Sequence, residues 1–250
     1  MSRPLVLLSN DDGYRARGIE TLRSALSSFA DVYICAPETE QSATSHSLSL
    51  HRPLRLFRHD DRVFSVDGTP ADSVYVALHA ETRVLPRKPD LVVSGMNHGV
   101  NLGDDVFYSG TVAAAREGAL KGFPSLAVSA AVDADGVAAA ALATKLARAL
   151  LAEARQGPLL LNVNFPKGST WPVKATRLGS RVYRDGVEFR RDPRGREYMW
   201  IGGPGVEHRE IAGSDTEAYD RGEVGVTPLV LDLWSRSSQE RAERVVTSFE

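Results

Sequence analysis

Five short apolar runs divide the first two thirds of this 250-residue chain, and four of them are followed by a helical pattern before the next run begins. Short runs that are apolar throughout are typical of strands buried on both faces, as in parallel sheets. Strands that alternate with helices predict right-handed βαβ units, and so an α/β fold with a Rossmann-like, three-layer αβα arrangement around a mostly parallel sheet. The runs are Leu5–Ser9, Val32–Cys35, Leu91–Ser94, Leu126–Ser129 and Leu159–Val163.

The segments between these runs carry helix and turn signals. Apolar residues recur at helical spacing from Ile19 to Phe29, which predicts an amphipathic helix. Thr69 and Pro70 have the residue types of an N-cap and a first helical position. Alternating apolar residues between Leu48 and Val66 predict short hairpin strands. Further helices are expected over 111–120 and 138–154.

The pattern changes after Pro166, where Arg, Gly and Pro become frequent and long helical periodicity is lost. We therefore expect a Rossmann-like metal- and phosphate-binding domain over 1–166, and β-hairpins and extended arms over 167–250 that complete the fold and contact other subunits. A brief helix is expected over 215–221 and a last strand over 226–233. Four aromatic residues of this part serve either assembly or a local core: Tyr183, Phe189, Tyr198 and Trp200.

The composition of the chain limits which binding partners and which cellular compartment we expect for it. A formal net charge of −2 and an isoelectric point near 6.3 lack the strongly basic footprint of a nucleic-acid-binding domain, so no nucleic-acid duplex is expected as a partner. No apolar stretch reaches the ~18 residues of a membrane span, so no membrane partner is expected. The single cysteine, Cys35, lies inside an apolar segment, which favours a buried thiol and a reducing, cytoplasmic location.

Oxygen donors follow three of the predicted strands at the point where each ends. Asp11 and Asp12 come directly after the first strand, and ligands of open α/β sheets bind outside the carboxyl ends of the strands. Two adjacent carboxylates repel each other, and a bound cation relieves that repulsion. A shell of oxygens alone suits Mg²⁺, Mn²⁺ or Ca²⁺ better than zinc. The other donors are Gln41, Ser42 and Ser45 after the second strand, and Asn97 and Asn101 after the third.

An anion site is predicted at Tyr108-Ser109-Gly110-Thr111, where a helix begins. Free backbone N–H groups and the positive end of the helix dipole attract anions at such a position, although a plain serine or threonine cap has the same residue types. A hard cation beside a phosphate-binding turn is an arrangement that can catalyse the transfer of a phosphoryl group to water. The motifs for dinucleotide binding, for Walker-type nucleotide triphosphatases and for α/β-hydrolases are all missing from the sequence.

Six stretches of the chain, in order, carry a resemblance to a known family. The most specific are Ser94–Gly103 (SGMNHGVNLG) and Tyr108–Gly118 (YSGTVAAAREG). The others are Ser9–Gly13, Ala36-Pro37 with Gln41-Ser42, Asp67–Asp72 and Thr227–Leu229. Together they resemble the SurE survival proteins, a family of metal-dependent 5′/3′-nucleotidases with a Rossmann-like amino-terminal domain.

The resemblance implies roles for individual residues. One divalent cation per subunit, Mg²⁺ or Mn²⁺, would be held by Asp11, Asp12, Ser42 and Asn97. The phosphate would be embraced by Asn101, Ser109, Gly110 and Thr111. The residues implied in catalysis are Asp11, Asp12, Asn101 and Ser109.

Two further features of the family bear on this chain. Its carboxy-terminal segments are exchanged between subunits, which implies a homodimer or homotetramer joined by the carboxy-terminal arms. The chain departs from the family pattern at Ala43, where glycine often follows the metal-binding serine. A left-handed backbone at this position would be strained for alanine.

The leading hypothesis is metal-dependent hydrolysis of nucleoside 5′- and 3′-monophosphates to nucleoside and phosphate, with Asp11 or Asp12 accepting the proton of the attacking water. The sequence does not decide between the two carboxylates, which would titrate as a coupled pair. A covalent aspartyl-phosphate mechanism through Asp11 is disfavoured, because such phosphatases carry a second aspartate where this chain has Gly13. Outside enzymes, the alternative is a metal-stabilised nucleotide sensor or scaffold.

Overall fold

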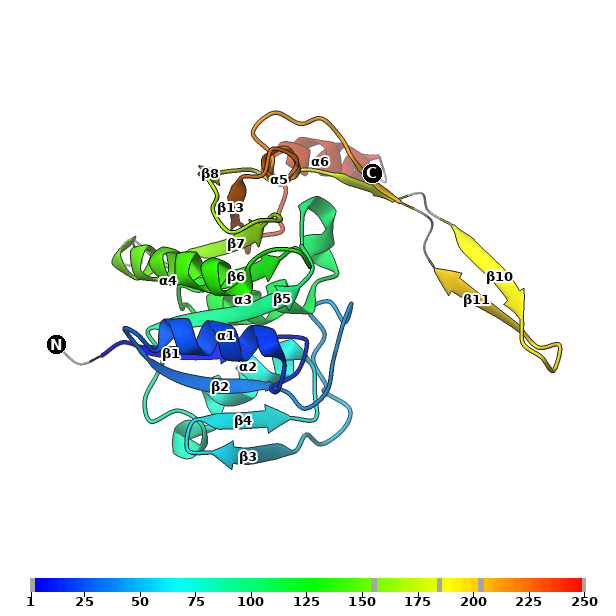
Figure 1. The fold of residues 1–250 in the computed structure, drawn as a ribbon. Coiled ribbons are helices and arrows are strands. Elements are labelled where there is room, and N and C mark those ends of the chain that lie inside the picture. The colour runs from blue at the N-terminus through cyan, green and yellow to red at the C-terminus, as the bar shows by residue number, and fades with distance from the viewer. Residues whose placement is uncertain (1–2, 154–156, 184–185, 202–204, 249–250) are drawn as a thin grey trace.

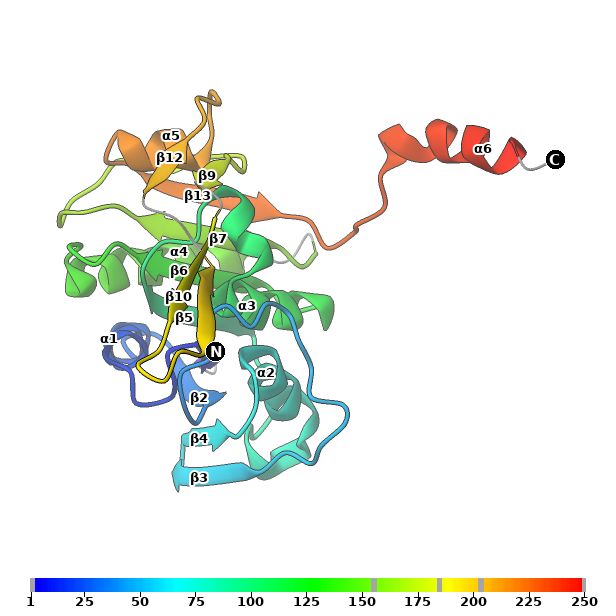
Figure 2. The ribbon, with the colours of Figure 1, turned by 90° about the vertical axis from the view of Figure 1, so that its right-hand side faces the viewer.

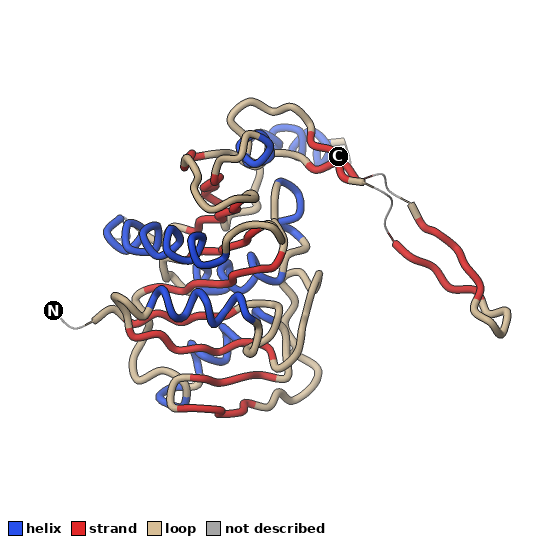
Figure 3. The backbone as a smooth tube through the Cα atoms, in the orientation of Figure 1, coloured by secondary structure: helices blue, strands red, loops and turns tan. Residues whose placement is uncertain are grey.

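One mostly parallel sheet runs through the computed structural model, which describes residues 3–153, 157–183, 186–201 and 205–248. Among these residues, nine strands form the sheet in the order β3-β4-β2-β1-β5-β6-β7-β13-β8 (Figures 1 and 3). Neighbouring strands from β4 to β7 are parallel, whereas β3 and β13 run antiparallel to β4 and β7. The α/β fold expected from the sequence is therefore confirmed. The strands are β1 (Leu5–Ser9), β2 (Asp31–Pro37), β3 (Leu56–Asp60), β4 (Val63–Val66), β5 (Leu91–His98), β6 (Ser125–Ala130), β7 (Leu160–Phe165), β8 (Val173–Ala175) and β13 (Val224–Leu229).

Helices cover both faces of this sheet. Helices α1 (Arg17–Leu26) and α4 (Gly136–Glu153) lie side by side on one face, and α2 (Pro70–His79) and α3 (Gly110–Leu120) lie on the other (Figures 1 and 2). Successive side chains of β1 point to opposite faces. Val6 and Leu8 accordingly enter the core under α1 and α4, while Leu5 and Leu7 enter the core under α2. Burial on both sides explains why these strands are apolar throughout.

The amino ends of α2 and α3 are capped by the residues expected to do so. The Thr69 hydroxyl accepts a hydrogen bond from the Asp72 backbone N–H at 3.0 Å, and the Asp72 carboxylate accepts one from the Thr69 N–H at 2.9 Å, which makes a complete capping box. Ser109 caps α3 by accepting from the Val112 N–H at 3.1 Å. Both helices therefore start at fixed positions next to the carboxyl ends of the strands.

The strand order creates a switch point between β1 and β5. Strand β2 pairs with one edge of β1, and β5 pairs with the other edge. The chain therefore leaves the carboxyl ends of these two strands in opposite directions, and a crevice opens where the loops diverge. The turn Asn10–Gly13 and the end of β5 with Asn97 both border this crevice.

Several sequence expectations need correction. Residues 48–54 are not strand, because the Ser49 N–H bonds the Asp72 carboxylate at 2.9 Å instead of a ladder partner. Strand β5 continues to His98 beyond an irregularity after Ser94, so Asn97 lies in the strand and not after it. The last strand is Val224–Leu229, shifted from the expected 226–233. Helix α6 (Gln239–Thr247) was not expected.

The part of the chain after Pro166 adds both sheet strands and arms. Strands β13 and β8 extend the sheet beyond β7. Figure 1 shows the β10–β11 hairpin reaching away from the body, and Figure 2 shows α6 doing so on another side. Among the described residues, no helix has the length and apolar character needed to cross a bilayer. The remaining elements are β9 (Arg181–Tyr183), β10 (Val187–Arg191), β11 (Glu197–Ile201), β12 (Val206–His208), α5 (Asp215–Asp220), and the 3₁₀ turns η1 (Glu81–Arg83), η2 (Gly103–Phe107) and η4 (Arg236–Ser238).

The close approach of α1 to β5 depends on Gly18. A Cβ atom added there would lie 2.0 Å from the backbone oxygen of Met96, which no rotamer change can relieve. We expect Gly18→Ala to lower the free energy of unfolding by about 2 to 3 kcal/mol through overpacking. The control is Gly136→Ala, whose added Cβ would meet only the flexible Met96 Cε at 3.2 Å. Equal urea midpoints for the two variants would contradict this account.

Candidate active site

The turn that follows β1 exposes one carboxylate and buries the other. The Asn10 side-chain amide donates to the Gly13 carbonyl at 2.9 Å, and Gly13 has a φ of +97°, which favours glycine. This closes the turn tightly at the end of the strand. Asp11 is buried, with 6% of its surface exposed, whereas Asp12 is half-buried at the mouth of the crevice.

Asp11 is held against the start of α3. The Thr111 hydroxyl donates a hydrogen bond to Asp11 Oδ1. A Cβ at position 110 would lie 2.8 Å from the Asp11 Cβ, so only glycine lets the helix approach this closely. Burial raises the pKa of Asp11 to about 6; the Thr111 hydrogen bond opposes the rise, and the neighbouring Asp12 charge adds to it. No positively charged side chain is among the groups that lower the pKa of Asp11.

Two more oxygen donors line the cleft with Asp11 and Asp12: Asn97 near the end of β5 and Ser42 in the loop after β2. The Asn97 amide nitrogen donates to the Gly99 carbonyl at 2.9 Å, which leaves its Oδ1 for a ligand. The Ser42 hydroxyl donates to Glu40 Oε1 at 2.7 Å, so its lone pairs remain available. Burial also raises the pKa of Asp12, and the Glu40 charge adds to this effect.

The loop that carries Ser42 is tied to both neighbours. The Gln41 N–H bonds the Asp11 carbonyl at 2.8 Å, and the Ser45 N–H bonds the Tyr108 carbonyl at 3.0 Å. These two bonds hold the Ser42 loop between the turn after β1 and the residues before α3. Gln41 and Ser45, which the sequence suggested as donors, act through their backbone in these contacts.

A cleft of about 480 Å³ collects these groups. It contains the four residues predicted as metal ligands, together with Asn101 and Ser109. Gly110 and Thr111 do not line it, since they lie behind Asp11 as described above. The lining residues are Asp11, Asp12, Glu40, Ser42, Ala43, Asn97, His98, Asn101, Asp105, Tyr108, Ser109 and Tyr183.

The donor set of this cleft fits a hard divalent cation. Four lining residues are carboxylates; Asp105 is paired with Arg181, and the described lining contains no Lys or Arg to balance Asp11, Asp12 and Glu40. Neutral oxygens from Ser42 and Asn97 complete an oxygen-only set, which suits Mg²⁺ or Mn²⁺. Across the described ranges, no cluster of three or more His, Cys, Asp or Glu side chains is placed to hold a metal. In this cleft the neutral oxygens of Ser42 and Asn97 would therefore have to complete the ligand set.

Asn101 is fixed by a buried network of polar groups. Its backbone N–H donates to Asn164 Oδ1 at 2.7 Å, and its carbonyl accepts from the amides of Asn162 and Asn164 at 2.8 and 3.0 Å. Its side-chain amide contacts the Ser129 hydroxyl at 2.8 Å. The loop after β5 is thereby locked onto β6 and β7.

The structure adds cleft residues that sequence reasoning missed. Asp105 lies in η2, and its carboxylate accepts hydrogen bonds from Arg181 and, at 2.6 Å, from the Tyr183 hydroxyl. Burial and the Asp105 contact raise the pKa of Tyr183 to about 12, so the phenol stays protonated. The only early signals were the acidic pair Asp104-Asp105 in the glycine-rich stretch and the aromatic character of Tyr183. Strand β9 thus supplies one wall of the cleft.

Comparison with models of protein families shows which family this chain belongs to. A family model described as Survival protein SurE matches residues 6–185. The chain belongs to the SurE family. Its match covers the sheet from β1 through β7, the whole turn after β1 and the start of α3, so the cleft lies inside the SurE region.

Individual SurE proteins align over nearly the full chain. A protein named 5′-nucleotidase SurE from Sorangium cellulosum (strain So ce56) is 66% identical, covering 93% of this chain and 92% of the relative. One with the same name from Anaeromyxobacter sp. (strain Fw109-5) is 52% identical, with 91% and 90% covered. The crystal structure of the SurE protein from Aquifex aeolicus superposes with a TM-score of 0.82 at 37% identity, covering 97% and 99% of the two chains.

The departure from the SurE pattern at Ala43 has a visible backbone consequence. Ala43 has a φ of 56°, so the left-handed conformation considered from the sequence is present. Ser45, two residues later, has a φ of 54°. This conformation costs an L-residue about 1 to 2 kcal/mol of conformational free energy. The backbone hydrogen bonds of Gln41 and Ser45 help to offset that cost.

The burial of Asp11 predicts a pH-dependent stability of the metal-free protein. Its pKa rises from 3.8 to about 6 on folding, so the folded state binds this proton more tightly. The stabilisation is complete below about pH 4 and is lost as the pH rises through 6, a change of about 3 kcal/mol. Asp12, whose pKa is also raised, works in the same direction.

Urea unfolding in EDTA between pH 4 and 8 measures this effect. The wild-type free energy of unfolding should fall across pH 4–7, and Asp11→Asn should flatten most of that fall. Glu38→Gln, which removes an exposed carboxylate outside the cleft, is the control and should keep the wild-type slope. A slope that survives in Asp11→Asn would disprove the role of Asp11 burial.

Proposed function

We propose that this chain is a divalent-metal-dependent 5′-nucleotidase, which hydrolyses nucleoside 5′-monophosphates to nucleoside and inorganic phosphate. The observation that carries the proposal is a cleft in which three carboxylates, Asp11, Asp12 and Glu40, meet no Lys or Arg in the described lining, while the fourth, Asp105, is paired with Arg181. A phosphate dianion is repelled by such a surface unless a cation lies between them. The names of the relatives, 5′-nucleotidase SurE, support the same activity.

The cation would be Mg²⁺ or Mn²⁺, one per subunit, held by Asp11, Asp12, Ser42 and Asn97. When bound it neutralises phosphate oxygens and lowers the pKa of a water molecule. Thr111 orients the Asp11 carboxylate through its hydroxyl. The Gly99 carbonyl orients the Asn97 amide so that its oxygen is presented.

The phosphate would lie between the start of α3 and Asn101. Ser109 lines the cleft as the cap of α3, and the first N–H groups of a helix have no partner within the helix. The Thr111 hydroxyl is already used by Asp11, so its contribution would be indirect. Asn101 would contact the phosphate with its amide, which the Ser129 hydroxyl holds in place.

The proton of the attacking water would pass to Asp11 or Asp12. Asp12 is the half-exposed member of the pair, while Asp11 Oδ1 already accepts a hydrogen bond from the Thr111 hydroxyl. A covalent mechanism through Asp11 is disfavoured by its burial and its fixed contact with α3. A non-catalytic sensor or scaffold is not favoured either, because the relatives are named as nucleotidases.

The activity is tested by phosphate release from AMP with Mg²⁺ or Mn²⁺. We expect EDTA to abolish it, and Asp11→Asn and Asp12→Asn each to lower kcat/KM at least about 100-fold while the fold is retained. Glu38→Gln is again the matched control and should keep wild-type activity. Phosphate release that persists in EDTA would overturn the metal dependence.

We also propose that the carboxy-terminal arms join two or four copies of the chain. In the β10–β11 hairpin, cross-strand pairing puts Val187 and Ile201 beside Phe189 and Met199 on one face. All four are exposed, between 49% and 89%. A two-stranded hairpin with an exposed apolar face is only marginally stable by itself. We therefore expect a second copy of the chain to pack against this face.

Light scattering coupled to gel filtration tests this assembly. Phe189→Asp with Met199→Asp should shift the mass from oligomer to monomer, because two charges would enter a buried contact. Glu188→Gln lies on the opposite face of the same hairpin and should leave the mass unchanged. A monomeric wild type would rule the proposal out.

The division at residue 166, the action on 3′-monophosphates and the cytoplasmic location stay predictions. Cys35, on which the compartment argument rested, is fully buried, and burial raises the pKa of its thiol to about 12. Its packing as a small apolar residue is as expected.

A further inference from the structure

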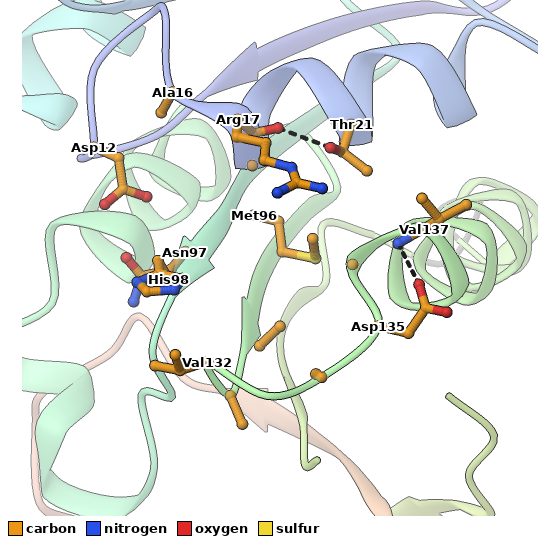
Figure 4. A pocket seen from close by; sticks show the side chains of 15 residues that line it. Asp12, Ala16, Arg17, Thr21, Met96, Asn97, His98, Val132, Asp135 and Val137 are labelled. Atoms are coloured by element: carbon orange, nitrogen blue, oxygen red, sulfur yellow. Dashed lines mark hydrogen bonds between the residues drawn. The ribbon is translucent and has the colours of Figure 1, made fainter. Parts of the chain in front are cut away.

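A second cavity, of about 580 Å³, adjoins the cleft. It lies between the start of α1, the end of β5, the segment after β6 and the start of α4 (Figure 4). Asp12, Asn97 and His98 line both the cavity and the cleft, so the two spaces adjoin at these residues. A molecule with its phosphate in the cleft would enter the cavity past these three residues.

The walls of this cavity combine apolar side chains with polar ones. Met96, Ala130 and Ala131 are buried residues that form its floor, and the exposed side chains of Val132 and Val137 stand at its rim. Its volume falls in the range of about 300 to 1,000 Å³ that small-molecule sites occupy. The apolar part of these walls suits the flat face of a ring, and the polar side chains suit the heteroatoms at its edge.

One cation stands in the cavity without a protein partner. Among the described residues, the Arg17 guanidinium makes no hydrogen bond or ion pair, whereas Arg23, further along α1, contacts Glu20 at 3.4 Å. Figure 4 shows the Arg17 side chain extending from α1 toward Met96, with Asp12 and His98 to one side and Val137 opposite. Arg17 and Met96 thus border the same space.

We propose that this cavity is the site of the nucleoside part of the substrate, with the base placed between the Arg17 guanidinium and the Met96 side chain. This inference rests on the proposed nucleotidase function. A guanidinium over an aromatic ring and a thioether beside one are both favourable contacts. The ribose would span the junction at Asn97 and His98, between base and phosphate.

The charges of the cavity favour a base over a second phosphate or a polyphosphate chain. Two carboxylates, Asp12 and Asp135, line it, and Arg17 is the single basic residue among its described lining besides His98. Asp135 Oδ1 is fixed by the N–H groups of Val137 and Ala138 at 2.9 and 3.1 Å. A polyanion would meet this carboxylate pair, whereas a neutral base would not.

Two substitutions test the cavity, each with a matched control. Arg17→Met removes the guanidinium and keeps the length of the side chain, and Arg23→Met is its control on the same helix. Val137→Trp fills the cavity from an exposed rim position, and Ala141→Trp, exposed and one turn further along α4, is its control. None of the four positions belongs to the proposed metal or phosphate site.

The kinetic readout compares AMP with ribose 5-phosphate, which has the same ester and no base. Arg17→Met and Val137→Trp should raise the KM for AMP at least about tenfold and leave kcat/KM for ribose 5-phosphate within about twofold. Both controls should resemble wild type. Equal losses on the two substrates, or an unchanged KM for AMP, would overturn the proposal.

Calorimetry with adenosine tests the cavity without any phosphate release. Adenosine should bind the wild-type protein, and Val137→Trp should weaken that binding at least about tenfold while Ala141→Trp does not. This measurement tests the nucleoside site independently of the proposed hydrolysis. Adenosine binding that is weakened by Val137→Trp supports the site even if AMP is not hydrolysed. No binding of adenosine to the wild type, or equal binding to all variants, would overturn it.

Discussion

The arrangement of the active site depends on the burial of two adjacent carboxylates at the end of β1. Asp11 and Asp12 are adjacent in the chain, and burial raises the pKa of both. The Thr111 hydroxyl and the backbone N–H groups of Asp11 and Thr111 compensate the Asp11 charge only in part, since its pKa stays raised. Glu40 adds a further negative charge to the lining of the cleft, while Asp105 is paired with Arg181. A fold that keeps such a site must bind a cation for it to be used, so metal binding and substrate binding are coupled through charge.

The strand order explains why this charge gathers where it does. The crevice at β1 and β5 is the place where loops diverge, so donors from both strands reach it without blocking one another. The Ser42 loop arrives from β2, the other neighbour of β1, and is tied to Asp11 by a backbone bond. Three loops that are distant in sequence thus meet over one turn.

Much of this could be predicted from the sequence because it depends on local patterns. The buried strands are apolar throughout, and the caps at Thr69 and Ser109 use residues with strong positional preferences. The strand order depends on contacts distant in sequence, which no local pattern encodes. The same limit applies to Thr111: it was expected to contact phosphate, and its bond to Asp11 depends on how closely α3 approaches β1. Asp105 and Tyr183 come together only because β9 packs against η2. Helix α6 is short, strongly polar and has no buried residue, so no apolar run marked it in the sequence.

The two sides of the cleft differ in stiffness. Asn101 is anchored by side chains of β6 and β7 inside the sheet, so moving it would break several buried hydrogen bonds at once. Ser42 lies in an exposed loop with left-handed residues at positions 43 and 45, and its side-chain bonds, such as those of Ser42 to Glu40 and of Ser45 to Phe107, are exposed to solvent. Because exposed bonds can be exchanged for bonds to water, the Ser42 side is the easier one to deform. Substrate entry and product exit would be accommodated by the Ser42 loop, while the Asn101 side serves as a rigid reference that keeps its geometry through each turnover.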